Sequence, residues 1–422
     1  MKKRLHFYVI AALLLLYITV SSTAQIIDGN YEVAIWKDFK EAAITYTFDD
    51  GCANQYSVAI PMLNEFNYNA TFFPVINWSP NWTSLQDAEN QGHEIGSHTV
   101  SHTDLNTLSI SQQDNELKNS QSTINSNISG QKCLTIAYPS CIPSDQATCE
   151  KYYIAARHCQ GYVENSTPAN FYSISSIVCG NQGAVKTVQN FKERDEAAAT
   201  SNGWCVYLIH GIDGDGGFSA LSSDTLRKSF EYLDENRDKF WVSTFVRVVC
   251  YIRERNCISV TEQDVHENFI TVEVTDTLDN SIYNHPVTLR RSLPGGWDTA
   301  LIKQNGVIVE SRIREINLTK YVEFNVVPDG GLVVIAESNE VNALSNQANT
   351  SSINIVPNPF TNELTVSTNG IFQYFIHSLD GKLIENGTSN NTKRIGGILS
   401  PGVYLLNIRN DFGSYSMKII KK

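Results

Sequence analysis

The chain has 422 residues, enough for roughly two to four domains of about 150 residues each. Its 32 Lys and Arg residues against 44 Asp and Glu residues give a formal net charge of −12. This acidic balance argues against nucleic acid as the main partner, because phosphate backbones are bound by basic surfaces. A hydrophobic content of 42% excludes disorder throughout, and a single long apolar run excludes a polytopic membrane protein.

Residues 1–24 have the pattern of a secretory signal peptide. Residues 2–4 are basic, residues 7–20 are apolar, and residues 22–24 are small and suit a cleavage site. A membrane anchor is the less favoured alternative, because the apolar run is short for a span and ends in small polar residues. We therefore expect a secreted or cell-surface protein with no stable membrane span after processing.

All nine cysteines lie between Cys52 and Cys257. Export permits disulfides, and an odd count leaves one thiol unpaired in a monomer, or free for a ligand or an intermolecular bridge. The sequence cannot give the pairing. We expect Cys52 to be half of a disulfide rather than a nucleophile, because no base is placed beside it.

Beyond residue 262 the sequence changes to strand-like patterns separated by glycine-rich turns. Residues 269–274 read F-I-T-V-E-V, and residues 321–327 read Y-V-E-F-N-V-V. The predicted organisation is an α/β catalytic domain at 25–262, a β-sandwich accessory domain at 263–340, a linker at 341–352 and a second all-β domain at 353–422.

The last block carries P-N-P-F (residues 357–360), D-G-K (380–382) and G-V-Y-L-L (402–406) in this order. With these motifs it resembles the C-terminal sorting domain of bacterial type IX secretion cargo. The resemblance implies passage across the outer membrane, removal of the domain on export, and the type IX secretion machinery as a partner. An ordinary adhesive β-module is the alternative.

Residues 25–262 alternate strand-like and helix-like segments, which favours an α/β barrel-like domain. Residues 43–48 and 70–75 are strand-like, while residues 224–239 have helical spacing and precede a strand-like segment at 240–245. In such a barrel the chemistry lies at the carboxyl ends of the strands.

Two adjacent carboxylates, Asp49 and Asp50, close the first of these strands in T-F-D-D-G. Neighbouring side chains point in different directions, so one carboxylate can bind a cation while the other acts as a base. A D-D-G turn that binds nothing is the common alternative.

A second motif, H-T-V-S-H, places His98 and His102 four residues apart. On one helical turn both imidazoles would face the same side, which is a metal-ligand spacing. With Asp50 they form a two-His, one-carboxylate set that leaves coordination positions open for water and substrate. A satisfied histidine pair is the alternative, and His93 is expected to be structural.

A third motif, L-I-H, brings His210 to the end of an apolar strand-like run, directly before a glycine-rich loop at 211–217. A catalytic acid needs that placement. Taken alone, the motif would indicate only a histidine that caps a buried strand.

Together, T-F-D-D-G, H-T-V-S-H and L-I-H resemble the polysaccharide deacetylase (NodB-homology) family, carbohydrate esterase family four, over roughly residues 42–255. The resemblance implies a distorted (β/α) barrel and one divalent metal, usually zinc. It implies hydrolysis of N-acetyl amides, which are carbon–nitrogen bonds other than peptide bonds, or of O-acetyl esters as in acetylxylan. The implied roles are a general base for Asp49, a general acid for His210, and metal ligands for Asp50, His98 and His102.

The family's third motif, R-x-P-Y, is altered here to A-Y-P-S, with alanine at 137 in place of the arginine and Ser140 in place of the aromatic residue. Tyr138 and Pro139 could still shape the site, and the amide of Ser140 could hold the oxyanion. Arg157, in A-A-R-H-C-Q-G-Y, could supply the missing cation from another loop. A surface charge at a helix end is an equal alternative for Arg157.

Three tryptophans are candidates for stacking on sugar rings: Trp204, Trp78 and Trp82. Aromatic faces suit the C–H faces of pyranoses, although a buried core tryptophan is the commoner case.

Two other functions compete with the predicted metal-dependent deacetylase. One is a carbohydrate-binding protein with a vestigial deacetylase site, in which the middle β domain does the binding. The other is a metallohydrolase that acts on amides without sugar. The sequence leaves open which acetylated polysaccharide or oligosaccharide is bound, and whether an amide or an ester is cleaved.

Overall fold

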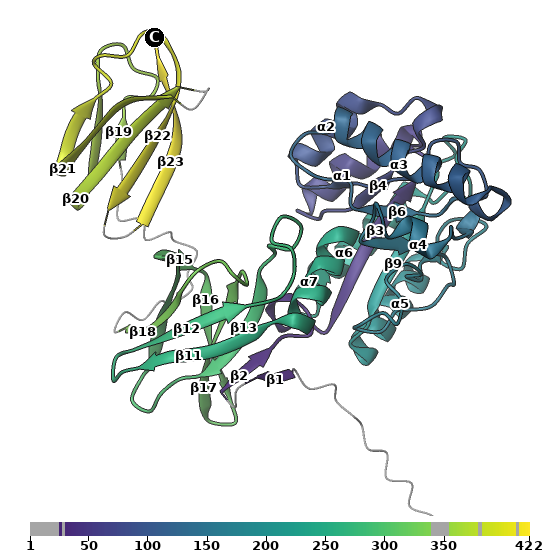
Figure 1. Cartoon of the computed structure of the whole chain (residues 1–422), viewed down its shortest axis with the longest axis horizontal. Coiled ribbons are helices and arrows are strands. Elements are labelled where there is room, and N and C mark those ends of the chain that lie inside the picture. The colour runs from purple at the N-terminus through teal and green to yellow at the C-terminus, as the bar shows by residue number, and fades with distance from the viewer. Residues whose placement is uncertain (1–24, 28–29, 339–353, 379–381, 411–412) are drawn as a thin grey trace, which may run out of the picture.

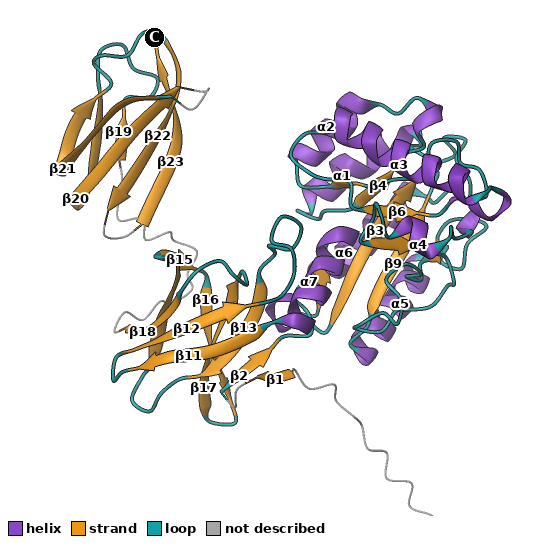
Figure 2. Cartoon of the chain, in the orientation of Figure 1, coloured by secondary structure: helices purple, strands orange, loops and turns teal. Residues whose placement is uncertain are grey.

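The computed structural model describes residues 25–27, 30–338, 354–378, 382–410 and 413–422. The predicted signal peptide at 1–24 and the predicted linker at 341–352 lie outside the described residues. Figure 2 shows helices gathered around one group of strands, while the other two parts are built from strands and loops. No helix in the described part of the chain is long and apolar enough to cross a bilayer.

The first part is a distorted α/β barrel, as predicted (Figure 1). Its strands are β3 (Ala42–Asp49), β4 (Thr71–Phe73), β5 (Glu94–Ile95), β6 (Thr135–Ala137), β7 (Ala155–Arg157), β8 (Ile177–Val178), β9 (Trp204–Ile209) and β10 (Phe240–Val242). Its helices are α1 (Ile60–Glu65), α2 (Trp82–Asn90), α3 (Ile110–Asn127), α4 (Gln146–Cys149), α5 (Val188–Ser201), α6 (Ser223–Glu235) and α7 (Phe245–Cys257).

Parallel pairing organises this barrel around β3. Strand β3 pairs with β9 on one side and with β10 and then β4 on the other, while β5 lies beyond β4 and β8 beyond β9. Single parallel bridges, Ser97 to Ile136 and Arg157 to Ile174, connect the separate β6–β7 pair to the two edges of this sheet. The carboxyl ends of the strands therefore meet at one rim.

The sequence of β3 explains its central place. All eight residues of A-A-I-T-Y-T-F-D are buried, and most are β-branched or aromatic, as in parallel strands covered on both faces. The strand-like segment predicted at 240–245 is shorter in the structure, because Thr244 caps α7 by accepting a hydrogen bond from the Arg247 amide.

The second part is a β-sandwich of two five-stranded sheets, ordered β1-β2-β13-β17-β16 and β11-β12-β18-β14-β15. Its strands are β1 (Gln25–Ile27), β2 (Tyr31–Val33), β11 (Ser259–Val265), β12 (Phe269–Thr275), β13 (Val287–Ser292), β14 (Thr299–Gln304), β15 (Val307–Val309), β16 (Ser311–Ile316), β17 (Thr319–Val326) and β18 (Val333–Ser338).

The sandwich includes residues on the barrel side of the boundary predicted between 25–262 and 263–340. Residues 25–33 leave the barrel domain and add two strands to the sandwich, where Val33 pairs with Leu289. Strand β11 also crosses residue 262 and pairs with β12. The barrel is therefore inserted into the sandwich, because backbone pairing joins the two ends of this region.

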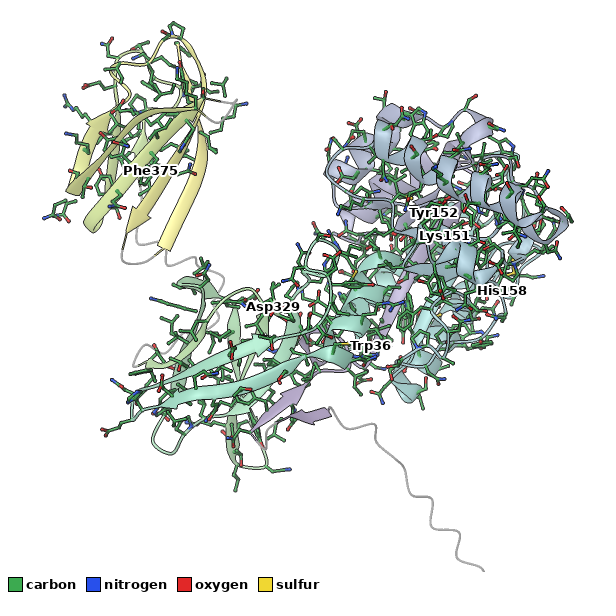
Figure 3. The ribbon with its side chains drawn as sticks, in the orientation of Figure 1. Trp36, Lys151, Tyr152, His158, Asp329 and Phe375 are labelled. Carbon is green, nitrogen blue, oxygen red and sulfur yellow. A yellow bond between two sulfur atoms is a disulfide. The ribbon has the colours of Figure 1, made fainter. Side chains whose placement is uncertain are left out.

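One hydrophobic cluster runs from the barrel through α7 into the sandwich. Trp36 lies at this junction (Figure 3), fully buried, and its indole donates a hydrogen bond to the Asn202 carbonyl. The Tyr251 hydroxyl of α7 donates to the Ala34 carbonyl at 2.9 Å. The sandwich thus packs against the barrel through a shared core.

The third part is an antiparallel sheet with its own core around Phe360, Leu406 and Ile419. Its strands are β19 (Asn354–Val356), β20 (Leu364–Ser378), β21 (Leu383–Ile395), β22 (Gly402–Asn410) and β23 (Gly413–Lys421). The all-β character expected for residues 353–422 is confirmed for the described residues.

Candidate active site

Asp49 and Asp50 lie where β3 ends. Asp49 is the last residue of the strand and is only 2% exposed, while Asp50 has a left-handed backbone with φ of 74° and starts the turn. The Gln55 side-chain amide donates to the carbonyls of Asp49 and His210, so it ties the ends of β3 and β9 together. The two carboxylates face different neighbours, Asp49 towards Arg157 and Asp50 towards the two histidines.

His98 and His102 lie in a loop, not on the helical turn that their spacing suggested. Thr99 and His102 have φ values of 66° and 60°, which breaks helical geometry. Glu116 of α3 holds this loop by accepting hydrogen bonds from the amides of residues 100 and 101, each at 2.9 Å. Both histidine Nε2 atoms nevertheless lie 3.6 Å from Oδ1 of Asp50.

The chemistry of these three side chains suits a divalent cation. Their ligand atoms lie within 4.8 Å of one another, and Oδ1 of Asp50 is buried without a hydrogen-bond partner. Nδ1 of His98 donates to the Ala137 carbonyl at 2.7 Å, which leaves the Nε2 lone pair free. Burial lowers the pKa of His98 to about 4, so the ring is neutral, as a ligand must be.

Burial, and then the charge of Asp49, raises the pKa of Asp50 to about 7. A carboxylate held among buried groups with an unpartnered oxygen is costly unless a positive charge compensates it. A cation bound by Asp50 and the two histidines would provide that compensation.

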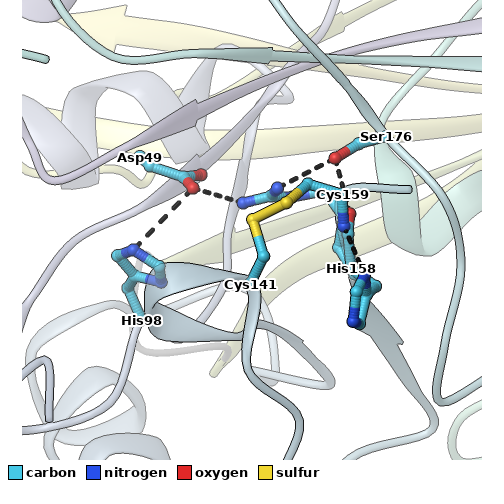
Figure 4. Close-up of a disulfide and its surroundings, with 7 residues drawn as sticks. Asp49, His98, Cys141, His158, Cys159 and Ser176 are labelled. Carbon is cyan, nitrogen blue, oxygen red and sulfur yellow. Dashed lines mark hydrogen bonds and ion pairs between the residues drawn. A yellow bond between two sulfur atoms is a disulfide. The ribbon is translucent and has the colours of Figure 1, made fainter. Parts of the chain in front are cut away.

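Arg157 supplies the positive charge beside Asp49. It is the last residue of β7, is 1% exposed, and pairs through Nη2 with Oδ2 of Asp49 (Figure 4). Its Nη1 donates to the Ser176 hydroxyl at 3.0 Å. Burial alone would raise the pKa of Asp49, but Arg157 and then His98 outweigh it, so the pKa lies below its ordinary value.

His210 follows β9 directly and lies on the same side of the barrel. Its Nδ1 has no hydrogen-bond partner among the described residues, and the ring of Phe218 packs edge-on against it at 5.1 Å. Burial lowers the pKa of His210, although the charge of Asp49 opposes this effect. This environment favours the neutral form of the ring.

A cavity of about 710 Å³ collects these groups. Its size is in the range of ligand pockets. Apolar walls come from Val178, Leu208 and Phe218. The predicted site residues that line it are Asp49, Asp50, His98, His102, Tyr138, Ser140 and His210.

The other predicted site residues do not line this cavity. Arg157 lies behind Asp49, and Pro139 is buried at the start of the turn that carries Ser140. Trp204 is fully buried in the core and donates to the Thr45 hydroxyl at 3.0 Å. The prediction that Trp204 stacks on a sugar is wrong, because neither face of its ring is accessible.

The other two tryptophans lie nearer the surface. Trp78 is 52% exposed and stacks on the His102 ring at 4.9 Å, so it borders the site. Trp82 begins α2 and packs against the barrel core.

The cysteines also differ from expectation. Cys52 is a free thiol, so the expectation of a disulfide there is wrong. Burial raises its pKa to about 12, which excludes a thiolate nucleophile at neutral pH. The disulfide joins Cys141 and Cys159, and both line the cavity. Each lies a few residues beyond a strand end, four after β6 and two after β7, and the pairing of these strands brings them together.

Two family models match parts of the chain. Residues 37–152 match the family model of polysaccharide deacetylases. Residues 354–422 match the model of a secretion system C-terminal sorting domain.

Two curated relatives share parts of the chain. Gellan lyase from Bacillus sp is 26% identical over 328 residues, which cover 73% of this chain and 13% of the lyase. YxkH of Bacillus subtilis, a protein named for the polysaccharide deacetylases, is 34% identical over 104 residues, or 24% of this chain and 37% of YxkH. The chain thus spans well under half the length of either relative.

A solved structure, the Xyl-CE4 domain of a multidomain xylanase from the hindgut metagenome of Trinervitermes trinervoides, is 20% identical with a TM-score of 0.37. The match covers 50% of this chain and 90% of that domain. The family matches and the motifs at the cavity lead to one conclusion. This chain carries a polysaccharide deacetylase domain and a C-terminal secretion sorting domain.

Proposed function

We propose that this protein is a secreted, metal-dependent deacetylase that hydrolyses acetyl groups from a glycan. The observation that carries the proposal is the convergence of Asp50, His98 and His102 beside the buried Asp49–Arg157 pair. His210 lies on the same cavity, so ligand, base and acid candidates share one space. Neither a surface turn nor a satisfied histidine pair would explain the buried, unpartnered Asp50 oxygen.

Asp50, His98 and His102 would hold the cation, for which we propose Zn²⁺ because two imidazoles and one carboxylate suit it. When bound, such a cation polarises a carbonyl oxygen and lowers the pKa of water. Asp49 has an unpartnered Oδ1 and can accept a proton from water on the cavity side. Arg157 keeps this carboxylate ionised and fixes its orientation.

His210 would donate the proton that the departing sugar oxygen or nitrogen requires. Its ring lines the same cavity as Asp49, and because its lowered pKa favours the neutral form, it would first take up the proton that Asp49 removes from water. The amide of Ser140, on the turn after β6, would donate a hydrogen bond to the oxyanion. An amide substrate depends on His210 more than an ester does, because an amine leaves poorly without a proton.

Export is the second half of this proposal. The sorting domain at 354–422 indicates passage to the cell surface or the medium. The sequence pattern of residues 1–24 supplies a signal peptide for the first membrane, and the type IX machinery would carry the protein across the second. Its substrate would then be an extracellular acetylated polysaccharide or oligosaccharide.

The test measures acetate released by the full chain from acetylated xylan and from chitin oligomers, after chelation and again after zinc is restored. Asp49→Asn is the matched control, because it should keep zinc affinity and lose turnover by about 100-fold or more. Release that requires zinc supports the proposal, and the polymer that responds separates ester from amide cleavage.

No release from either polymer at full zinc occupancy would contradict deacetylation of these glycans. Glycan binding that persists without metal would then favour the carbohydrate-binding alternative. Activity on acylated amides that lack a sugar would favour the other metallohydrolase.

A further inference from the structure

The turn after β6 and the segment after β7 carry two groups with different tasks at the proposed site. Strands β6 and β7 run parallel, and the pair of Ala137 with Arg157 brings their ends side by side. The first end leads to Ser140, while the second places Arg157 beside Asp49. A covalent bond between Cys141 and Cys159 joins the two segments, with Cα atoms 5.6 Å apart.

The segment that follows β7 is anchored on its far side by residues 174–176. The His158 amide donates to the Ile174 carbonyl at 2.7 Å, and the Gly161 amide donates to the Ser176 carbonyl at 3.1 Å. The Ser176 hydroxyl accepts from Arg157 and donates to the His158 carbonyl (Figure 4). Cys159 therefore belongs to a segment whose position is set by several hydrogen bonds.

The turn after β6 has weaker support. The Tyr138 amide donates to the Arg157 carbonyl at 3.2 Å, and beyond it the backbone hydrogen bonds of the turn are local, from the Cys141 amide to the Tyr138 carbonyl and from the amide of residue 142 to the Pro139 carbonyl. Ser140 and Cys141 have left-handed backbones with φ of 51° and 58°, which side chains other than glycine adopt at a cost. The disulfide fastens this strained turn to the anchored segment.

Both half-cystines line the same cavity as Ser140 and Asp49, so a shift of the turn would alter the reaction space directly. We propose that the Cys141–Cys159 disulfide is a positioning element for catalysis. The disulfide keeps the Ser140 amide in a fixed position relative to the Asp49–Arg157 pair, and its sulfur atoms take no part in the chemistry. This inference rests on the proposed deacetylase function.

The test compares the full-length wild type with the double variant Cys141→Ser/Cys159→Ser. Cys257→Ser is the matched control, because Cys257 is a free, exposed cysteine at the end of α7. Acetate release is measured on whichever substrate the wild type deacetylates faster, acetylated xylan or chitin oligomers, and gives kcat and KM. Zinc titration gives the metal affinity. We expect kcat of the double variant to fall about 10- to 100-fold, because small misplacements cost that much. KM and zinc affinity should change less than about twofold, and the control should match the wild type.

Reduction of the folded wild type with a phosphine provides a second route if the double variant fails to fold. The same fall in kcat, reversed on reoxidation with zinc retained, supports the inference. An unchanged kcat in an active protein without the disulfide overturns it. A fall that only accompanies loss of zinc or unfolding also overturns it, since the bond would then be merely structural. A wild type that releases no acetate overturns the proposed function together with the inference.

Discussion

The two ends of β5 make an informative comparison, because each carries a buried histidine and they lie only five residues apart. His93 precedes the strand, and His98 follows it. Nδ1 of His93 accepts the Ala70 amide hydrogen at 3.1 Å, and Nε2 contacts Oδ1 of Asn64 at 3.1 Å. Both ring nitrogens of His93 are therefore satisfied within the protein.

His98 differs at its Nε2 atom. Its Nδ1 is engaged by the Ala137 carbonyl, whereas Nε2 faces Asp49 and Asp50 at 3.7 and 3.6 Å.

The buried carboxylates Glu94 and Asp50 show the same contrast. Glu94 accepts hydrogen bonds from the Thr71 hydroxyl and the Val246 amide, while Asp50 keeps a buried oxygen without a partner. Of the two ends of β5, the one proposed to bind a cation is the one where a buried carboxylate oxygen lacks a partner in the protein.

The largest expected effect is at His98. His98→Gln should lower zinc affinity by more than about 100-fold and reduce acetate release to background, because it removes a proposed ligand and not merely a supporting contact. Zinc titration of the chelated protein and acetate release measure the two effects. Stoichiometric zinc in a folded His98→Gln protein would contradict the assigned ligand set.

Arg157→Ala should lower kcat about 100-fold, because the base loses its buried partner. It should also destabilise the protein by roughly 3–5 kcal/mol, since Asp49 is left as an uncompensated buried charge. Turnover and chemical denaturation measure the two effects. A wild-type kcat in this variant would show that Arg157 is not needed for catalysis.

Asp195 is a buried carboxylate away from the cavity, and it extends the comparison between Glu94 and Asp50. Burial raises its pKa to about 8, and the Tyr207 hydroxyl lies near both Asp195 and the Phe191 carbonyl. The folded state therefore favours the protonated form of Asp195. The contribution of this protonation to the free energy of unfolding is complete below about pH 4 and is lost as the pH rises toward 8.

Asp195→Asn should remove that pH dependence. In denaturant unfolding, the free energy of unfolding of the variant minus that of the wild type should increase by about 1 kcal/mol for each pH unit between pH 4 and 8. Parallel stability profiles for the two proteins would show that Asp195 does not titrate in this way.

Trp78→Ala should raise KM about two- to tenfold with little change in kcat, if the exposed ring stacks on substrate. Zinc affinity must be measured too, because Trp78 also packs on His102. Trp78→Phe should retain most of the affinity. An unchanged KM in the alanine variant would remove Trp78 from the binding surface.

The smallest effect on turnover is expected at His93. His93→Gln should leave kcat unchanged and cost about 1 kcal/mol of stability, because one of its two hydrogen bonds is lost. Acetate release and thermal unfolding provide the readouts. Loss of activity at His93 as severe as at His98 would remove the distinction between the two ends of β5.

The candidate site was predictable to the extent that it lies in contiguous motifs at strand ends. Asp49 and Asp50 follow a strand whose apolar run is visible in the sequence, and His210 follows another. His98 and His102 were paired for the wrong local reason, since their loop is not helical. They converge because left-handed residues and Glu116 shape that loop.

Residues that act across the fold could not be assigned in this way. The sequence allows a catalytic and a surface interpretation of Arg157 equally, and the parallel pairing of β6 with β7 places it against Asp49. Trp204 looked like a ring for sugar binding, but its strand lies inside the barrel. The place of residues 25–33 in the sandwich likewise depends on pairing with a strand more than 250 residues away.

The sequence by itself therefore determined the fold class, the sorting domain and the motif residues, because hydrophobic period and short-range spacing are local properties. Tertiary structure alone decided the partner of Asp49, the Cys141–Cys159 link and the insertion of the barrel into the sandwich. Each of these features depends on which strands lie side by side. Strand pairing joins residues that are far apart along the chain, and the local sequence does not show which strands will pair.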